Sequence, residues 1–171
     1  MENGIKKILR DKYGLFEKDI EILLEKFTKF SVPKREIILQ EGQTDHYIYF
    51  VEKGIVKSTI LREGREFIIF FALENDAPLS SPNLTESRQS LYTLEAVDTC
   101  ILWRISRKDL ATSFKDSLNL SNWGRMILQE WLTSSSFYFS SIHWMSKKEQ
   151  YQYLLKEMPK LIQRLSMREC W

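Results

Sequence analysis

The amino-acid sequence predicts an α+β protein, an antiparallel β jelly roll with short helices before it and one long helix after it. Residues 32–71 contain four short runs rich in β-branched and aromatic residues, separated by lone glycines. Closely spaced runs joined by glycine turns are typical of antiparallel sheets. On either side of this stretch, apolar residues recur at spacings of three and four, which indicates helices.

The segment before the strands is predicted to form one or two short helices. Its apolar residues extend from Ile5 to Phe30 near helical spacing, and Gly14 interrupts the pattern. A glycine at such a point commonly ends a helix. We therefore expect two short helical pieces that pack on the jelly roll.

The strands themselves are best marked between residues 47 and 71. Residues 47–51 (YIYFV) are apolar at every position, which suits a strand covered on both faces. The triplets at 52–54 (EKG) and 62–64 (REG) each separate two such runs. Their glycines supply the positive φ that a tight hairpin requires, so two hairpins are predicted here.

Two capping motifs predict where later helices begin. Residues 106–109 (SRKD) resemble a capping box and open a short helix, and residues 146–149 (SKKE) open another that Pro159 stops. Between them, a helix is predicted over about 116–140. Its apolar stripe consists of Leu120, Trp123, Ile127, Trp131 and Tyr138.

This helix is long for the predicted jelly roll. At 1.5 Å per residue it spans roughly 30 Å, and a small jelly roll covers only part of that length. We therefore expect the stripe to form a homodimer interface; the alternative is that Trp123 and Trp131 pack on the jelly roll of their own chain. The predicted organisation is a jelly-roll domain with N-terminal helices at 1–115, a dimerisation helix at 116–140 and a further helical region at 141–171.

Composition excludes several classes of protein. The chain has 171 residues, a net charge of +2 and two cysteines, too few for a disulfide framework or an iron–sulfur cluster. No run of eighteen apolar residues predicts a membrane span, and the first residues lack the features of a signal peptide. We therefore expect a cytoplasmic protein without membrane contact, cofactor or metal.

The ordered set of motifs resembles the cyclic-nucleotide-binding domain of the catabolite activator protein and fumarate–nitrate regulator (Crp/Fnr) family of bacterial transcription regulators. The matching residues lie at 41–43 (EGQ), 47–51 (YIYFV), 54–57 (GIVK), 64–66 (GRE), 94–99 (LEAVDT) and 105–110 (ISRKDL). The resemblance implies a jelly-roll sensor domain, a long dimerisation helix and a small-molecule effector. It implies no enzymatic activity.

The sequence departs from this family in the phosphate-binding cassette, which falls at residues 73–91. The usual cassette has a Gly-Glu pair and an arginine that binds the phosphate; here glycine is absent and the arginine position falls on Ser90. Three interpretations stay open: a loop that binds nothing, a site for another small ligand beside Arg88, or a true cyclic-nucleotide site. The candidate ligand-binding residues are Glu74, Asp76, Ser80, Ser81, Arg88 and Ser90.

The C-terminal region resembles the start of the family's helix-turn-helix. Residues 141–171 carry six Lys/Arg against three Asp/Glu, but they supply no second helix to enter a DNA groove. We expect specific DNA binding only if this end is completed. The leading hypothesis is a Crp/Fnr-like sensor with an unknown effector. The alternative is a dimerisation or interaction protein that does not bind DNA, and an enzyme of the cupin type lacks the necessary histidine spacing.

Overall fold

The structure, a computed structural model, describes residues 4–140 and 144–164, with the backbone alone at 138–140, 147 and 157. Nine strands form three antiparallel sheets. The strands are β1 (Thr28–Val32), β2 (Ile37–Leu39), β3 (Thr44–Asp45), β4 (Tyr47–Lys53), β5 (Val56–Arg62), β6 (Arg65–Ala72), β7 (Arg88–Gln89), β8 (Thr93–Ala96) and β9 (Cys100–Ser106).

The arrangement of these strands confirms the predicted jelly-roll type of fold. The sheets have the strand orders β1-β9-β4, β2-β8-β5-β6 and β3-β7, so strands distant in sequence lie side by side. The sheets do not close into a continuous barrel of hydrogen bonds among the described strands. Their facing sides form the core, and Val56, Leu94 and Phe70 contribute buried side chains to it.

One of the two predicted hairpins forms, between β5 and β6. The hairpin predicted at residues 52–54 was wrong, because β4 pairs with β9 whereas β5 pairs with β6 and β8, so these residues form a turn between two sheets. Arg62 pairs with Arg65 across the β5–β6 hairpin, and the two residues between them, Glu63 and Gly64, have φ of 51° and 74°. Positive φ at both central positions defines the turn that matches strand twist. At Gly54, φ is 105° and an added Cβ would lie 2.6 Å from the Cys100 sulfur, so only glycine fits.

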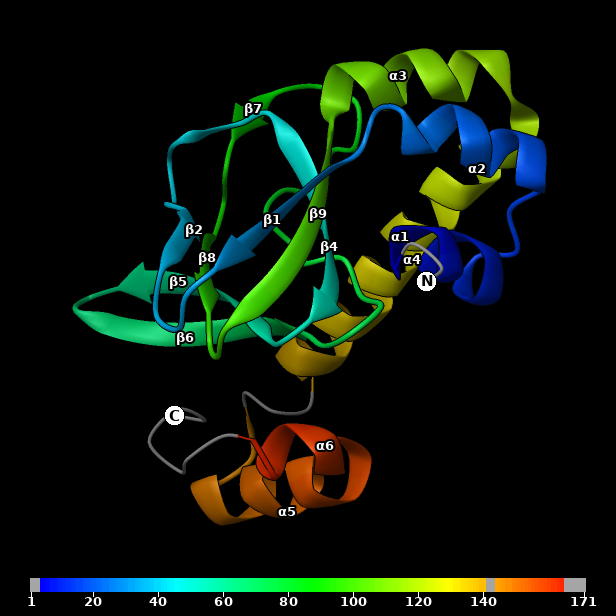
Figure 1. Cartoon of the computed structure of the whole chain (residues 1–171). Helices are drawn as coiled ribbons and strands as arrows, with labels where there is room; N and C mark the ends of the chain where they lie inside the picture. The colour runs from blue at the N-terminus through cyan, green and yellow to red at the C-terminus, as the bar shows by residue number, and fades with distance from the viewer. Residues whose placement is uncertain (1–3, 141–143, 165–171) are drawn as a thin grey trace.

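Helices α1 to α4 lie on one side of the sheets, and α5 and α6 lie below the end of α4 (Figure 1). They are α1 (Gly4–Lys7), the π-helix η1 (Ile8–Lys12), α2 (Glu17–Leu24), α3 (Arg107–Asp116), α4 (Leu118–Ser140), α5 (Lys147–Glu157) and α6 (Pro159–Ile162). The break at Gly14 and the two N-terminal pieces confirm the prediction. The prediction of helix as far as Phe30 was wrong at the C-terminal end of the segment, because the residues from Thr28 onward form strand β1, which pairs with β9.

The predicted caps also form. The Ser106 side chain accepts a hydrogen bond from the Asp109 amide, and Ser146 and Glu149 make a complete capping box. Pro159 ends α5 and begins α6. None of the described helices has the length and hydropathy of a membrane span.

Helix α4 packs against the jelly roll of its own chain. Leu120, Trp123, Ile127 and Trp131 are all buried, and the Trp123 ring stacks on Phe50 with centroids 5.8 Å apart. The apolar stripe assigned to a dimer interface therefore faces the core, because the jelly roll covers more of α4 than its size suggested. The side chain of Tyr138 lies outside the described residues.

Candidate functional site

The cassette segment at 73–91 contains a buried polar cluster at its centre. Ser80 donates a hydrogen bond of 2.5 Å to the carboxylate of Asp45, which lies on β3. That carboxylate also pairs with Arg107, the first residue of α3, and Arg107 Nε donates to the Asp45 carbonyl at 3.1 Å. Asp45 is 0% and Arg107 1% exposed. The ion pair therefore fixes the cassette between β3 and α3.

The cassette serines are bonded within the protein. Ser90 donates to the carbonyl oxygens of Ser80 at 3.1 Å and Tyr92 at 2.6 Å. Ser81 is also buried. At the position that the resemblance gives to the phosphate-binding arginine, the chain thus has a buried serine that joins the end of the cassette to its centre.

The start of the cassette is bonded to helices. Lys12 of η1 lies 2.9 Å from the Asp76 carboxylate and 3.1 Å from Glu130 of α4. Burial lowers the pKa of Lys12, but the two carboxylates outweigh it and raise that pKa above its usual value. One residue further, the indole N–H of Trp131 donates to the Ala77 carbonyl at 2.7 Å. Ala77 is therefore bonded directly to α4, and Asp76 is connected to α4 through Lys12.

Two further candidates are more accessible to solvent. The Arg88 side chain is 65% exposed and pairs with Glu86 at 2.6 Å. Glu74 accepts hydrogen bonds from the Gly54 amide at 3.0 Å and from Arg164 at 2.6 Å. The structure thus brings Ser80 and Ser90 together, places Asp76 and Glu74 on separate flanks, and leaves Arg88 on the surface.

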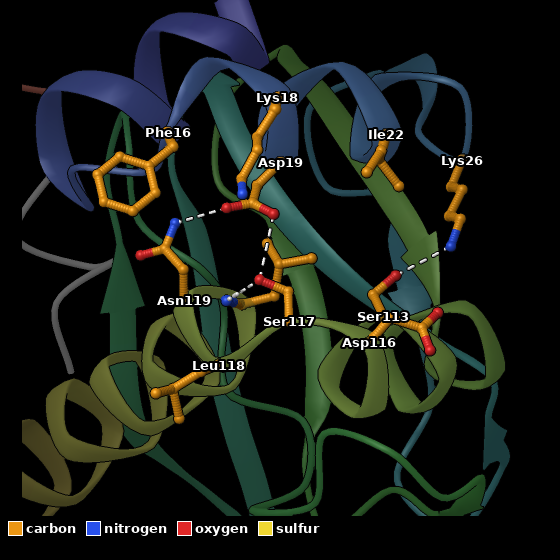
Figure 2. Close-up of a pocket in the computed structure, with 11 residues that line it drawn as sticks. Phe16, Lys18, Asp19, Ile22, Lys26, Ser113, Asp116, Ser117, Leu118 and Asn119 are labelled. Atoms are coloured by element: carbon orange, nitrogen blue, oxygen red, sulfur yellow. Dashed lines mark hydrogen bonds between the residues drawn. The ribbon is translucent and has the colours of Figure 1, made fainter.

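A hollow of about 460 Å³ lies elsewhere, between α2 and the α3–α4 junction (Figure 2). At its centre the buried Asp19 carboxylate accepts hydrogen bonds from Ser117 at 3.1 Å and Asn119 at 2.8 Å. Phe16 and Leu118 are exposed at its rim. The residues that line it come from outside the cassette, and its central carboxylate already joins α2 to the beginning of α4.

Sequence reasoning missed the Asp45–Arg107 pair. The sequence singled out no role for Asp45, and Arg107 lies inside a capping motif whose charged residues usually face solvent. The two residues come together only because β4 pairs with β9. The last pair of that ladder is Tyr47 with Ser106, and Asp45 and Arg107 lie just beyond it. No local pattern reports that proximity. Among the described residues no group of three or more potential metal ligands is present.

The sheets and the helices around them define a jelly-roll domain. The chain belongs to the cyclic nucleotide-binding domain family, whose model matches residues 29–117. No curated protein matches the chain. Its relatives are instead found among solved structures.

Two bacterial proteins are similar over most of the chain. FixK2 from Bradyrhizobium japonicum is 20% identical with a TM-score of 0.74, covering 84% of this chain and 75% of its own. A putative Crp/Fnr-family transcriptional regulator from Eubacterium rectale is 22% identical with a TM-score of 0.72, covering 90% and 71%.

The regulatory domain of Toxoplasma gondii PKA, crystallised with cAMP, is also similar, at 21% identity and a TM-score of 0.58. The match covers 64% of this chain and 42% of that one. These structures share the fold of this chain.

Proposed function

We propose that this chain is the sensor and dimerisation part of a Crp/Fnr-like transcription regulator. The observation that carries the proposal is the direct bond between cassette and long helix, Trp131 Nε1 to the Ala77 carbonyl at 2.7 Å. Lys12 adds a second connection, because it bridges Asp76 of the cassette and Glu130 of α4. A change in the cassette therefore acts on α4 through bonded groups.

The dimer interface is proposed on the outer face of α4. Leu118, Leu128 and Leu132 are 88%, 38% and 69% exposed, although all three are large apolar side chains. Together with Arg125 they recur at spacings of seven, three and four, as in the seam of a two-stranded coiled coil. A second copy of α4 against this face buries the three leucines.

The proposed effector is a small molecule other than a cyclic nucleotide. The hydroxyls of Ser80 and Ser90 are already bonded to protein groups, and Arg88 pairs with Glu86. A phosphate at this place must displace those bonds and lacks the arginine that gives a charge-assisted pair. DNA binding is proposed only for a chain with a complete helix-turn-helix. The proposed role of this chain is regulatory, non-catalytic and cytoplasmic.

The coupling between cassette and α4 is testable by amide hydrogen exchange on the whole chain. Trp131→Phe keeps an aromatic ring but removes the donor to Ala77. Because such a bond contributes about 0.5–1.5 kcal/mol, exchange within residues 73–91 should accelerate by up to about tenfold. Trp123→Phe is the matched control, since Trp123 is a buried tryptophan of the same helix whose indole N–H has no hydrogen-bond partner among the described residues. Equal exchange of the cassette in both variants contradicts the coupling.

A further inference from the structure

Helices α5 and α6 lie beneath the end of α4, next to the sheets (Figure 1). Leu154 of α5 and Leu161 of α6 are buried in a small apolar cluster with Ile55, Phe71 and Val97 of the jelly roll. This cluster is separate from the main core, which contains the residues that pack against Trp123. The helical pair therefore docks on the sensor domain through a limited apolar contact.

One arginine adds charge to this contact. Arg164, two residues after α6, lies with Nη1 2.6 Å from Glu74 and Nη2 2.6 Å from Asp98. Glu74 begins the cassette, and Asp98 lies in the turn between β8 and β9. The guanidinium thus joins the C-terminal segment to two separate loops of the jelly roll.

Both carboxylates are held in place by backbone groups. Glu74 accepts from the amide of Gly54 at 3.0 Å, and Asp98 accepts from the amide of Ile55 at 2.7 Å. Partial burial raises the pKa of the Glu74 carboxyl, but the bonds from Arg164 and Gly54 outweigh it and keep that pKa below its usual range. Two amides of the β4–β5 turn therefore hold both carboxylates in place beside Arg164.

We propose that Arg164 is a latch that keeps the α5–α6 pair closed on the jelly roll and that opens when the start of the cassette moves. The side chains of Arg164, Glu74 and Asp98 are each about one third exposed. Ion pairs of this exposure contribute modestly and are screened by salt, so the closed arrangement is easily shifted. Since Glu74 belongs to both the latch and the cassette, displacement of one alters the other.

Amide hydrogen exchange of the whole chain tests the latch. Arg164→Met should accelerate exchange in residues 147–162 on the order of tenfold, while the amides of β4 and β9 stay protected. Lys160→Met removes the same charge from α6, where Lys160 is exposed, and should behave like the wild type. Adding Glu74→Gln to Arg164→Met should have little further effect on α5, because their interaction is already lost.

Two results overturn the latch. One is exchange in α5 that Arg164→Met accelerates no more than Lys160→Met does. The other comes from the wild type and is needed if Arg164→Met fails to fold, which rapid exchange in β4 and β9 would reveal. The wild type is then measured from low salt to about 1 M salt, where screening should accelerate exchange in α5 selectively. Exchange in α5 that does not respond to salt contradicts the proposal.

Discussion

Asp45→Asn is expected to cause a large loss of stability from a change of one atom. In the folded protein the Asp45 carboxylate neutralises Arg107, and both side chains are essentially excluded from water. Asparagine keeps the shape and one acceptor oxygen but removes the negative charge. The guanidinium of Arg107 is then a buried charge without compensation.

The size of the loss follows from the burial of the pair. Removing one partner of a buried ion pair costs about 3–5 kcal/mol, because the other charge loses its counterion without regaining water. For a chain of this length each kcal/mol lowers Tm by about 2–4 °C, so Tm should fall by about 6–20 °C. The acceptors that remain for Arg107 are neutral, namely the backbone carbonyl of residue 45 and the Ser80 hydroxyl, and its Nη1 has no hydrogen-bond partner among the described residues.

Denaturant unfolding, followed by tryptophan fluorescence, measures this loss. Arg88→Gln breaks the exposed pair with Glu86 and is the matched control, expected to leave the midpoint unchanged. The double variant Asp45→Asn with Arg107→Met should recover part of the loss, since no charge is left buried. A cost below about 1 kcal/mol for Asp45→Asn, the range of a surface pair, refutes the reasoning.

Four further outcomes are expected. Leu128→Glu with Leu132→Glu should give folded monomers in sedimentation analysis, whereas a folded dimer of this variant contradicts a dimer interface on the outer face of α4. Calorimetric titration with cyclic AMP and cyclic GMP should show weak binding or none; a micromolar Kd lost in Arg88→Ala would show that Arg88 binds phosphate. The pKa of the Glu74 carboxyl is lowered in the folded protein. The contribution of Glu74 to the latch is therefore present at pH values above the ordinary pKa of about 4.5 and is lost as pH falls through the folded pKa. Carboxyl NMR should show that pKa rising in Arg164→Met. The 171-residue chain should bind duplex DNA without sequence preference and with steep salt dependence; tight binding to one sequence contradicts this.

The strands, turns and caps were predictable because each has a local cause. Positive φ at Gly64 and the bonded pair Ser146–Glu149 follow from residue type and spacing alone. The spacing of apolar residues, every second residue in strands and every third or fourth in helices, likewise indicates which residues face an apolar partner.

The identity of that partner is not a local property. The apolar stripe through Trp123 and Ile127 indicated that α4 buries one face. Burial against the jelly roll and burial against a second chain require the same spacing of apolar residues, so the stripe does not tell the two partners apart. The exposed leucines opposite the stripe were overlooked because they are fewer and lie beside polar residues. Asp45 and Arg107 escaped prediction for a related reason, since 62 residues separate them and only the strand pairing brings them together.

The central claim, that the cassette and the dimerisation helix act as one unit, is tested most directly by the dimer dissociation constant. Sedimentation equilibrium on the wild type, Trp131→Phe and the control Trp123→Phe measures this constant for chains that keep all the leucines of the outer face. We predict weaker dimerisation in Trp131→Phe alone, because only that variant breaks the bond between α4 and Ala77. Equal dissociation constants for the three proteins, or a wild type that stays monomeric at tens of micromolar, contradict the claim.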